Sequence, residues 1–342
     1  MNHKKVLLTG ITGFLGSHTA IQLLNKGYQV TGTLRDPRRI NSIREIIAQH
    51  TPGVHNLTIE VADLNDAHIW KKLAQNMDYI QHIASPFPRQ LPKQENDLIL
   101  PAQKGTLNIL RAASEAEVKR VVMVSSLAAV VYGKSKKELS QVFTENDWTD
   151  ETNKQDTTPY MRSKTFAEKA AWEYLRQHAC GLELTTVLPG AILGPVLEED
   201  FGTSANIVVS ILNGSLPAMP KISFDLIDVR SVAALLIQAM ETAQSANKRY
   251  IASAGCLTFA QIAKILKQQY PDRKISTREL PNFATKIFSV FEKNLKPILI
   301  DLGVKRKTDI SKANNELNWQ PLSVKEAILA CAQSAIQHKI VK

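Results

Sequence analysis

The chain has 342 residues, of which 44% are hydrophobic and 22% charged, with a formal net charge of +10. This length predicts one large or two moderate domains, and the composition excludes a disordered, coiled-coil or fibrous protein. No apolar run approaches the roughly 18–20 residues of a membrane helix, so no membrane association is expected. Basic residues are scattered without a recognition module, so we expect no nucleic-acid partner. The three cysteines lie far apart with no neighbouring metal ligands: Cys180, Cys256 and Cys331. They predict reduced thiols, a cytoplasmic protein and no metal site.

Strands and helices alternate along the first 190 residues. Short apolar runs predict strands at 4–9, 28–35, 56–62, 79–85, 120–125 and 182–188. Helical spacing of apolar residues predicts helices at 14–26, 38–49, 65–75, 101–116 and 158–178. Such alternation is typical of βαβ units. It predicts an α/β fold with a doubly wound, Rossmann-type parallel sheet, whose ligands bind at the carboxyl ends of the strands.

The pattern loosens after residue 190. A helix is predicted at 228–240, and a strand at 249–254 that joins the edge of the sheet. We therefore predict a dinucleotide-binding domain formed by residues 1–194 plus about 226–255. A smaller, discontinuous substrate-binding lobe would comprise about 195–225 plus 256–342. The polar, irregular segment 132–157 is expected to form a loop over the substrate mouth.

Glycines at positions 10, 13 and 16 directly follow the first predicted strand and open the first predicted helix. Gly10 would permit a tight turn, Gly13 a close approach of backbone to a pyrophosphate, and Gly16 close packing of the helix on the strand. The helix N-terminus adds free N–H groups and a positive dipole end. Three glycines can also merely mark turns, but the flanking strand and helix favour a phosphate-binding loop. The remaining predicted cofactor contacts of this loop are Thr12, Phe14 and Leu15.

The choice of dinucleotide depends on the end of the second strand. NAD enzymes usually carry an acidic residue there, which binds the ribose diol. This chain has Arg35, whose guanidinium suits a 2′-phosphate, and the sequence therefore predicts NADP(H). In the alternative interpretation, Arg35 is a surface charge and Asp36 binds the ribose. Asp36 lies one residue beyond the expected position and can also cap the next helix.

Three further residues suggest proton transfer to a carbonyl oxygen. Tyr160 and Lys164 are four residues apart on the predicted helix 158–178 and share one of its faces. The Lys164 ammonium is expected to lower the pKa of Tyr160 and to bind the cofactor ribose. Ser126 ends the fifth predicted strand, where its hydroxyl would polarise a carbonyl. Ser125 is the competing candidate, and strand alternation should point the two side chains differently.

These elements, in this order, resemble the extended class of the short-chain dehydrogenase/reductase family. Several runs resemble its dihydroflavonol reductase and cinnamoyl-CoA reductase branch: 33–37, 82–87, 105–108, 144–150, 163–172, 188–190, 194–195 and 227–230. The resemblance implies NADPH-dependent reduction of a small ketone or aldehyde to an alcohol, with Ser126, Tyr160 and Lys164 as catalytic residues. It implies the following cofactor contacts: Arg35 at the 2′-phosphate, Asp63 and Leu64 at the adenine, and Ala84, Ser85, Pro189 and Gly190 along the nicotinamide path. A homodimer through the helix that carries Tyr160 is common among such proteins.

Two departures from that branch bear on function. Plant flavonoid reductases carry an asparagine where this chain has Val131, so a flavonoid substrate is not expected. They also tend to carry a lysine where this chain has Ser42, which leaves Arg38 or Arg39 for any further phosphate contact. Two alternative functions remain: a sugar-nucleotide epimerase or dehydratase that retains NAD, and an NADP-sensing protein without catalytic activity.

Overall fold

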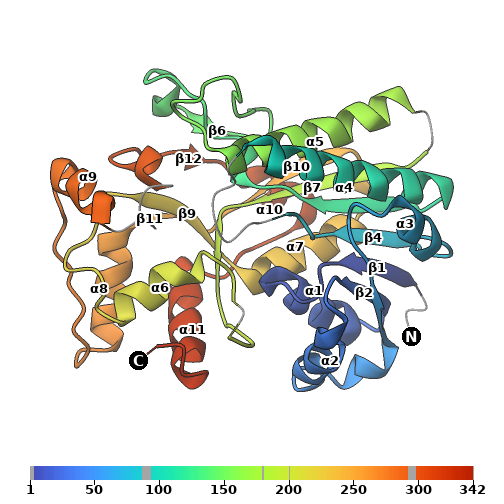
Figure 1. The fold of residues 1–342 in the computed structure, drawn as a ribbon, viewed down its shortest axis with the longest axis horizontal. Coiled ribbons are helices and arrows are strands. Elements are labelled where there is room, and N and C mark those ends of the chain that lie inside the picture. The colour runs from blue at the N-terminus through green and yellow to red at the C-terminus, as the bar shows by residue number, and fades with distance from the viewer. Residues whose placement is uncertain (1–3, 87–93, 179–180, 200, 292–297, 342) are drawn as a thin grey trace.

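The computed structural model describes residues 4–86, 94–178, 181–199, 201–291 and 298–341 (Figure 1). Cys180 and the end of the 82–87 run lie outside these ranges. The core of the fold is a seven-stranded sheet with the order β10-β7-β5-β4-β1-β2-β3. The strands are β1 (Lys5–Thr9), β2 (Gln29–Leu34), β3 (Leu57–Val61), β4 (Tyr79–His82), β5 (Arg120–Val124), β7 (Glu183–Pro189) and β10 (Lys248–Ala252). Every neighbouring pair is parallel. The predicted doubly wound sheet is confirmed, with β10 at its edge.

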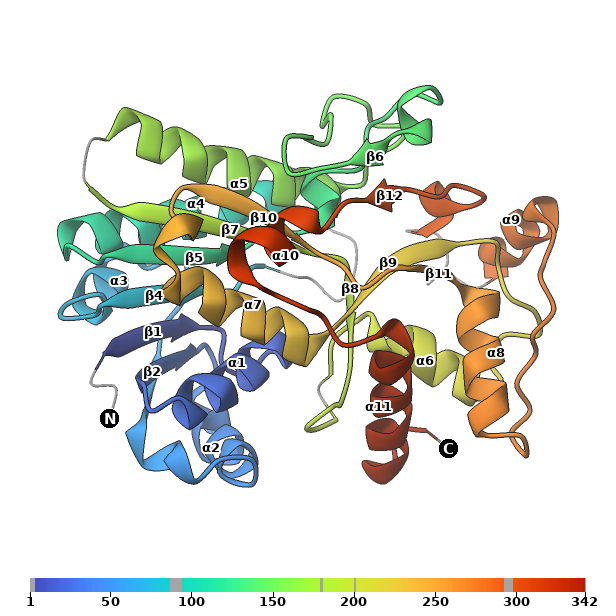
Figure 2. The same ribbon diagram turned by 180° about the vertical axis from the view of Figure 1, so that it is seen from behind.

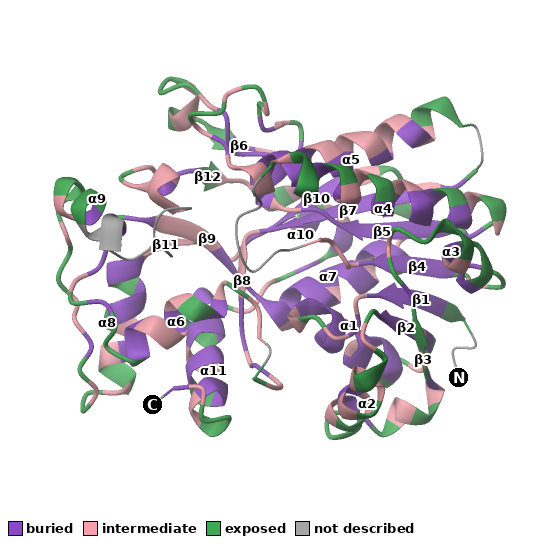
Figure 3. Cartoon of the chain, in the orientation of Figure 1, coloured by how far each residue is buried: buried purple, intermediate pink, exposed green. Residues whose placement is uncertain are grey.

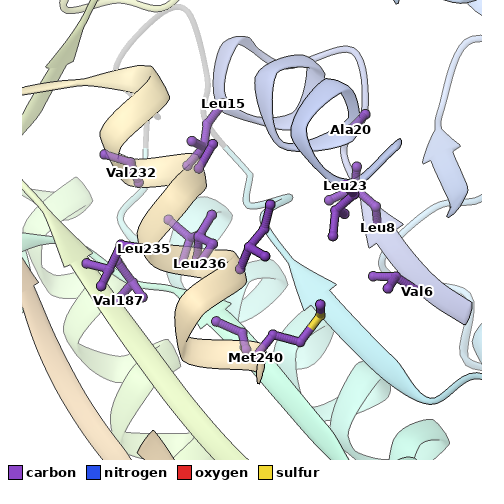
Figure 4. Packing of buried hydrophobic residues seen from close by; sticks show 14 of the residues in the cluster. Val6, Leu8, Leu15, Ala20, Leu23, Val187, Val232, Leu235, Leu236 and Met240 are labelled. Atoms are coloured by element: carbon purple, nitrogen blue, oxygen red, sulfur yellow. The ribbon is translucent and has the colours of Figure 1, made fainter. Parts of the chain in front are cut away.

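Helices cover both faces of this sheet. One face carries α1 (Phe14–Asn25), α2 (Ile40–Ala48) and α7 (Val229–Glu241), and the other carries α3 (Ala67–Leu73), α4 (Asn96–Glu115) and α5 (Pro159–Gln177). Figure 4 shows α1 and α7 packing side by side over the sheet. Because both faces are covered, β4 and β5 are buried along their whole length. Figure 3 shows these buried strands. The edge strand β3 is the exception, because most of its residues are exposed or half-buried.

Helix α4 begins earlier than the sequence pattern predicts. We expected its first residue at Pro101, whereas the helix begins at Asn96 and has Pro101 inside it. Leu98 and Ile99 are buried, so burial of apolar side chains favours the additional N-terminal residues of the helix. Pro101 is the sixth residue of this helix, and its missing N–H removes one helical hydrogen bond there.

A second layer lies beyond the carboxyl ends of the strands (Figure 2). It contains a small sheet of β8 (Ala191–Leu193), β9 (Ser223–Asp228) and β11 (Cys256–Thr258). The helices α6 (Ala205–Leu212), α8 (Phe259–Gln269) and α11 (Val324–Gln337) share a separate hydrophobic cluster with it. Helix α9 (Asn282–Phe291) lies at the far end, whereas α10 (Ser311–Leu317) and Trp319 pack into the cluster under α1 and α7.

The segment 132–157 is largely irregular in the structure, as its composition predicts. Its strand β6 (Val142–Phe143) pairs in parallel with β12 (Lys307–Thr308), which ties the segment to the C-terminal part of the chain. Short 3-10 helices complete the fold: η1 (Pro37–Arg39), η2 (Pro52–Asn56), η3 (Leu127–Ala129), η4 (Glu138–Ser140) and η5 (Ala243–Ser245). Within the described ranges, no helix has both the length and the apolar character that crossing a membrane requires.

Candidate active site

The glycine loop joins β1 to α1 at the carboxyl edge of the sheet. Gly10 adopts φ +74° and its N–H donates to the Thr33 carbonyl (3.1 Å), which turns the chain sharply above β2. A Cβ on Gly16 would lie 2.1 Å from the Gly10 carbonyl oxygen, so only glycine lets the helix approach the strand this closely. Gly10 therefore permits the tight turn, and Gly16 permits the close packing of helix on strand, as the sequence predicts.

The N-terminus of α1 is open to an anion. No side chain caps Gly13, and the first turn holds no acidic residue. The first helical hydrogen bond runs from the Ser17 N–H to the Gly13 carbonyl (2.9 Å). The N–H groups of residues 14–16 therefore precede the helical ladder and have no acceptor within it. Gly13 is exposed, and a Cβ there would meet only the Gly10 carbonyl, at 3.4 Å. This geometry fits a bound phosphate group.

Several charged residues follow β2, beginning with Arg35. The Arg35 side chain is exposed immediately beyond the strand. Asp36 caps η1 and pairs with the Arg38 guanidinium (2.7 Å), which holds the pKa of its carboxyl at about 2. Arg39 pairs with Glu198 (2.6 Å). Asp36 is thus occupied as a cap, the role that competed with ribose binding, and its charge is offset by Arg38. The assignment of a 2′-phosphate to Arg35 stays a prediction.

Ser126 and Tyr160 meet at the end of β5. Their side chains are hydrogen-bonded to each other. The Ser126 hydroxyl oxygen also accepts the Ala128 N–H (3.1 Å), which leaves its proton for Tyr160 or for a substrate oxygen. Lys164 follows Tyr160 by one turn of α5 and is only 7% exposed. The three residues that the sequence selected are therefore close together in the fold.

The protonation states differ from the expectation. Burial of the phenol raises the pKa of Tyr160, and the hydrogen bond from Ser126 offsets part of that rise. The expected lowering by Lys164 was wrong for the protein alone: burial raises the pKa of Tyr160, and the group that opposes the rise is Ser126. Burial also lowers the pKa of Lys164 to about 8, although Glu168 opposes this. Near neutral pH the site holds a protonated phenol beside a mostly protonated amine, the state that suits donation of a proton.

Ser125 faces away from Tyr160 toward another partner. Its hydroxyl donates to the Glu168 carboxylate (2.6 Å), and the residue is 2% exposed. The neighbouring Ser126 is half-buried at the strand end. Strand alternation thus separates the two serines as expected, and the geometry favours Ser126 as the residue that contacts a carbonyl.

The remaining predicted cofactor contacts lie at the same edge. The Thr9 hydroxyl accepts N–H groups from Ile83 and Ala84 (3.0 Å each), which fixes the chain after β4. The Gly190 N–H donates to the Ala252 carbonyl (3.0 Å), directly after the buried Pro189. Following β3, Asp63 accepts the Asn65 N–H, while Leu64 accepts the Asn108 side-chain amide (2.9 Å). Ser85 follows Ala84 and is half-buried.

His82 and Asn108 play structural parts. Burial lowers the pKa of His82 to about 3, so its imidazole is neutral in the working range and does not serve as a cationic acid. His82 contacts the Thr9 hydroxyl (3.0 Å). Because Asn108 donates to the Leu64 carbonyl, it anchors the loop after β3 to α4.

Comparison with known proteins identifies the family. Residues 6–253 match the model of the NAD dependent epimerase/dehydratase family. The chain belongs to this family. Among its relatives are a cinnamoyl-CoA reductase of Medicago truncatula, 30% identical over 79% of this chain and 82% of the relative, and an anthocyanidin reductase of Vitis vinifera, 32% identical over 80% and 83%. The crystal structure of the yeast methylglyoxal/isovaleraldehyde reductase Gre2 with NADPH superimposes with a TM-score of 0.81, 26% identity and coverage of 98% and 99%. These matches confirm the expected reductase branch of the extended class.

Sequence reasoning missed two buried polar clusters. One is centred on Glu168 and Arg249, and the other on Arg306. Arg306 contacts Asp301 and Asp156 (2.5 Å each) and donates to the Val131 carbonyl (3.0 Å). Charged residues this deeply buried are rarely without function or pairing. Asp301 is only five residues from Arg306, but the other partners lie 81 or more residues apart along the chain, so no local pattern could have indicated either cluster.

Proposed function

We propose that this chain is an NADPH-dependent reductase that converts a small ketone or aldehyde to an alcohol. The observation that carries the proposal is the meeting of Ser126, Tyr160 and Lys164 at the strand ends, beside an uncapped helix N-terminus. Relatives named as reductases, and the NADPH complex of Gre2, support it. The named substrates of those relatives differ, so the carbonyl compound is proposed only as a class.

Each residue has a proposed part in the reaction. The N–H groups that open α1 would bind the pyrophosphate, and the exposed Arg35 guanidinium would bind the 2′-phosphate. NADPH supplies the hydride when bound. Ser126 donates a hydrogen bond to the substrate oxygen, and Tyr160 gives that oxygen a proton as negative charge develops on it. The Lys164 ammonium stabilises the phenolate that remains.

The arrangement of the whole chain is proposed from the same features. The Rossmann domain, residues 1–194 plus about 226–255, would bind the coenzyme, with α10 and Trp319 packed against it. The rest of the small lobe would shape the substrate pocket. The thiols of Cys256 and Cys331 are free, which supports a cytoplasmic location. A homodimer through α5 is proposed from the resemblance, and Phe166 and Trp172 of this helix line a surface groove with Gln103 and Trp148. Light scattering tests the dimer, and a monomeric mass would contradict it.

The experiment is an NADPH-oxidation screen across aldehydes, diketones and aromatic ketones. Wild-type protein should oxidise NADPH with at least one class, and Tyr160→Phe should lower kcat by roughly 10²–10⁴-fold because the proton donor is lost. NADPH binding, followed by fluorescence, should survive in the variant. Near-wild-type turnover by Tyr160→Phe would refute the role of this residue. A tightly held NAD that co-purifies, without carbonyl reduction, would instead favour the epimerase or dehydratase.

A further inference from the structure

Glu168 is a fully buried carboxylate that accepts hydrogen bonds from several elements. One oxygen accepts the Thr186 hydroxyl (2.8 Å) and the Arg249 Nε–H (2.8 Å). The other accepts the Ser125 hydroxyl (2.6 Å). The Trp172 indole N–H adds a longer contact, at 3.3 Å. Both oxygens are thus satisfied inside the protein, which a buried charge requires.

These contacts connect the parts of the proposed catalytic site. Ser125 directly precedes Ser126 at the end of β5. Glu168 follows Lys164 by four residues on α5, so the two side chains share a face of the helix. The carboxylate therefore ties the helix that carries Lys164 to the strand end that carries Ser126. Neither link passes through the substrate or the coenzyme.

Arg249 extends this network to the segment 132–157. Its guanidinium stacks on the Trp148 ring, with 3.7 Å to the ring centre. It also donates to the carbonyls of Glu145 and Asp147 (2.8 Å to the latter). The Arg249 side chain is 9% exposed, so the ion pair with Glu168 is shielded from solvent. Loss of one partner would leave an uncompensated buried charge.

We propose that Glu168 is a positioning residue. It fixes the helix that carries Lys164 relative to the strand end that carries Ser126, and it provides the buried negative charge near Lys164. The positioning part of this inference rests on the proposed reductase function. Its electrostatic part concerns only the chain itself. The two parts can therefore be tested separately.

The charges around Lys164 support this assignment. Burial lowers the pKa of Lys164 to about 8, and the nearby Glu168 charge acts in the opposite direction. The other titratable groups close to Lys164 are Tyr160 on the same helix and His82 at the end of β4. Both are neutral near pH 7, since burial raises the pKa of the phenol and lowers that of the imidazole to about 3. Glu168 thus supplies the negative charge in this part of the described structure.

The test is a titration of Lys164 in the protein without coenzyme. Acetic anhydride is applied across a pH series, and acylation of Lys164 is quantified by peptide mass spectrometry. Wild-type protein should show a midpoint near 8. Glu168→Gln keeps the shape of the side chain but removes the charge, and should lower the midpoint by about one pH unit. The matched control Thr186→Val removes a hydrogen bond to the same carboxylate but no charge, and its midpoint should match the wild type.

If Glu168→Gln does not fold, a second variant still tests the inference. Glu168→Gln combined with Arg249→Met removes both members of the ion pair, which avoids a lone buried charge. Its Lys164 midpoint should also fall. A folded single or double variant with the wild-type midpoint would overturn the inference. In the NADPH assay, Glu168→Gln should lower kcat and move its alkaline limb to lower pH. Absence of wild-type turnover would count against the reductase proposal alone, because the acylation experiment needs neither coenzyme nor substrate.

Discussion

At the scale of single residues, two serines that are adjacent in the chain have different roles, one structural and one proposed to be chemical. Ser125 is buried against Glu168, whereas Ser126 reaches Tyr160 and caps η3. The sequence could name both candidates and could favour Ser126 from strand alternation. It could not reveal Glu168 as the partner that occupies Ser125, because 43 residues separate them.

The two serines should therefore give different phenotypes on replacement by alanine. Ser126→Ala should lower kcat/KM by about 10²–10³-fold, because it removes a donor to the developing alkoxide. Ser125→Ala should lower kcat/KM by less, because it only breaks the link from Glu168 to the strand end, and should lower the free energy of unfolding by about 1–3 kcal/mol, since Glu168 loses a buried hydrogen bond. Steady-state kinetics and urea unfolding measure the two effects. Equal catalytic losses in both variants would contradict the assignment of Ser126.

At the scale of elements, the first half of the chain was predictable because its strands and helices are long enough to show a period. The sequence predicted each strand from β1 to β7 in the central sheet, and β10 as its edge strand. Strands β8, β11, β6 and β12 have only two or three residues, too few for any periodicity. Helices α8 and α11 did have a local signal that we did not use. Each begins with a capping box, formed by Thr258 with Gln261 and by Ser323 with Glu326.

The preference for one coenzyme is predicted to depend on Arg35, which directly follows β2. Arg35→Ala should lower the preference for NADPH over NADH by about 10- to 100-fold, the range expected for hydrogen bonds to a charged group. Arg44→Ala is the control, because it removes an equal charge from α2, the next α-helix after Arg35 in the chain. The ratio of kcat/KM for the two coenzymes is the measurement. If Arg35→Ala keeps the wild-type ratio, the 2′-phosphate binds elsewhere.

At the scale of the whole molecule, two buried histidines couple stability to pH. His18 is hydrogen-bonded through Nε2 to the Pro195 carbonyl (2.8 Å), which joins α1 to the chain after β8. A carbonyl only accepts, so Nε2 carries the proton and donates it. Burial lowers the pKa of His18 to about 4 and that of His82 to about 3. Both side chains are neutral in the folded protein at mildly acidic pH, where the unfolded chain protonates them.

Acidification should therefore destabilise the fold. Because the folded pKa values lie below the unfolded value of 6.5, this stability is present above pH 6.5 and is lost as pH falls toward 4 and 3. Each histidine should contribute about 1.4 kcal/mol per pH unit between pH 6 and 5. Urea unfolding at several pH values measures the slope, and His18→Gln should reduce it by one histidine's share. A slope that is unchanged in this variant would show that His18 is already protonated in the fold.

The wrapping of the C-terminal segment has a consequence for how the protein is made. The indole of Trp319 donates to the Ser231 carbonyl (2.9 Å), and α10 completes the cluster under α7. The domain that begins at the first residues is thus finished only after the ribosome has added residue 319. Until then the apolar surface of α7 that this segment covers stays exposed to water, as in a partly folded intermediate. A premature stop shortly after β10 would leave a sheet with all seven strands but a bare hydrophobic flank.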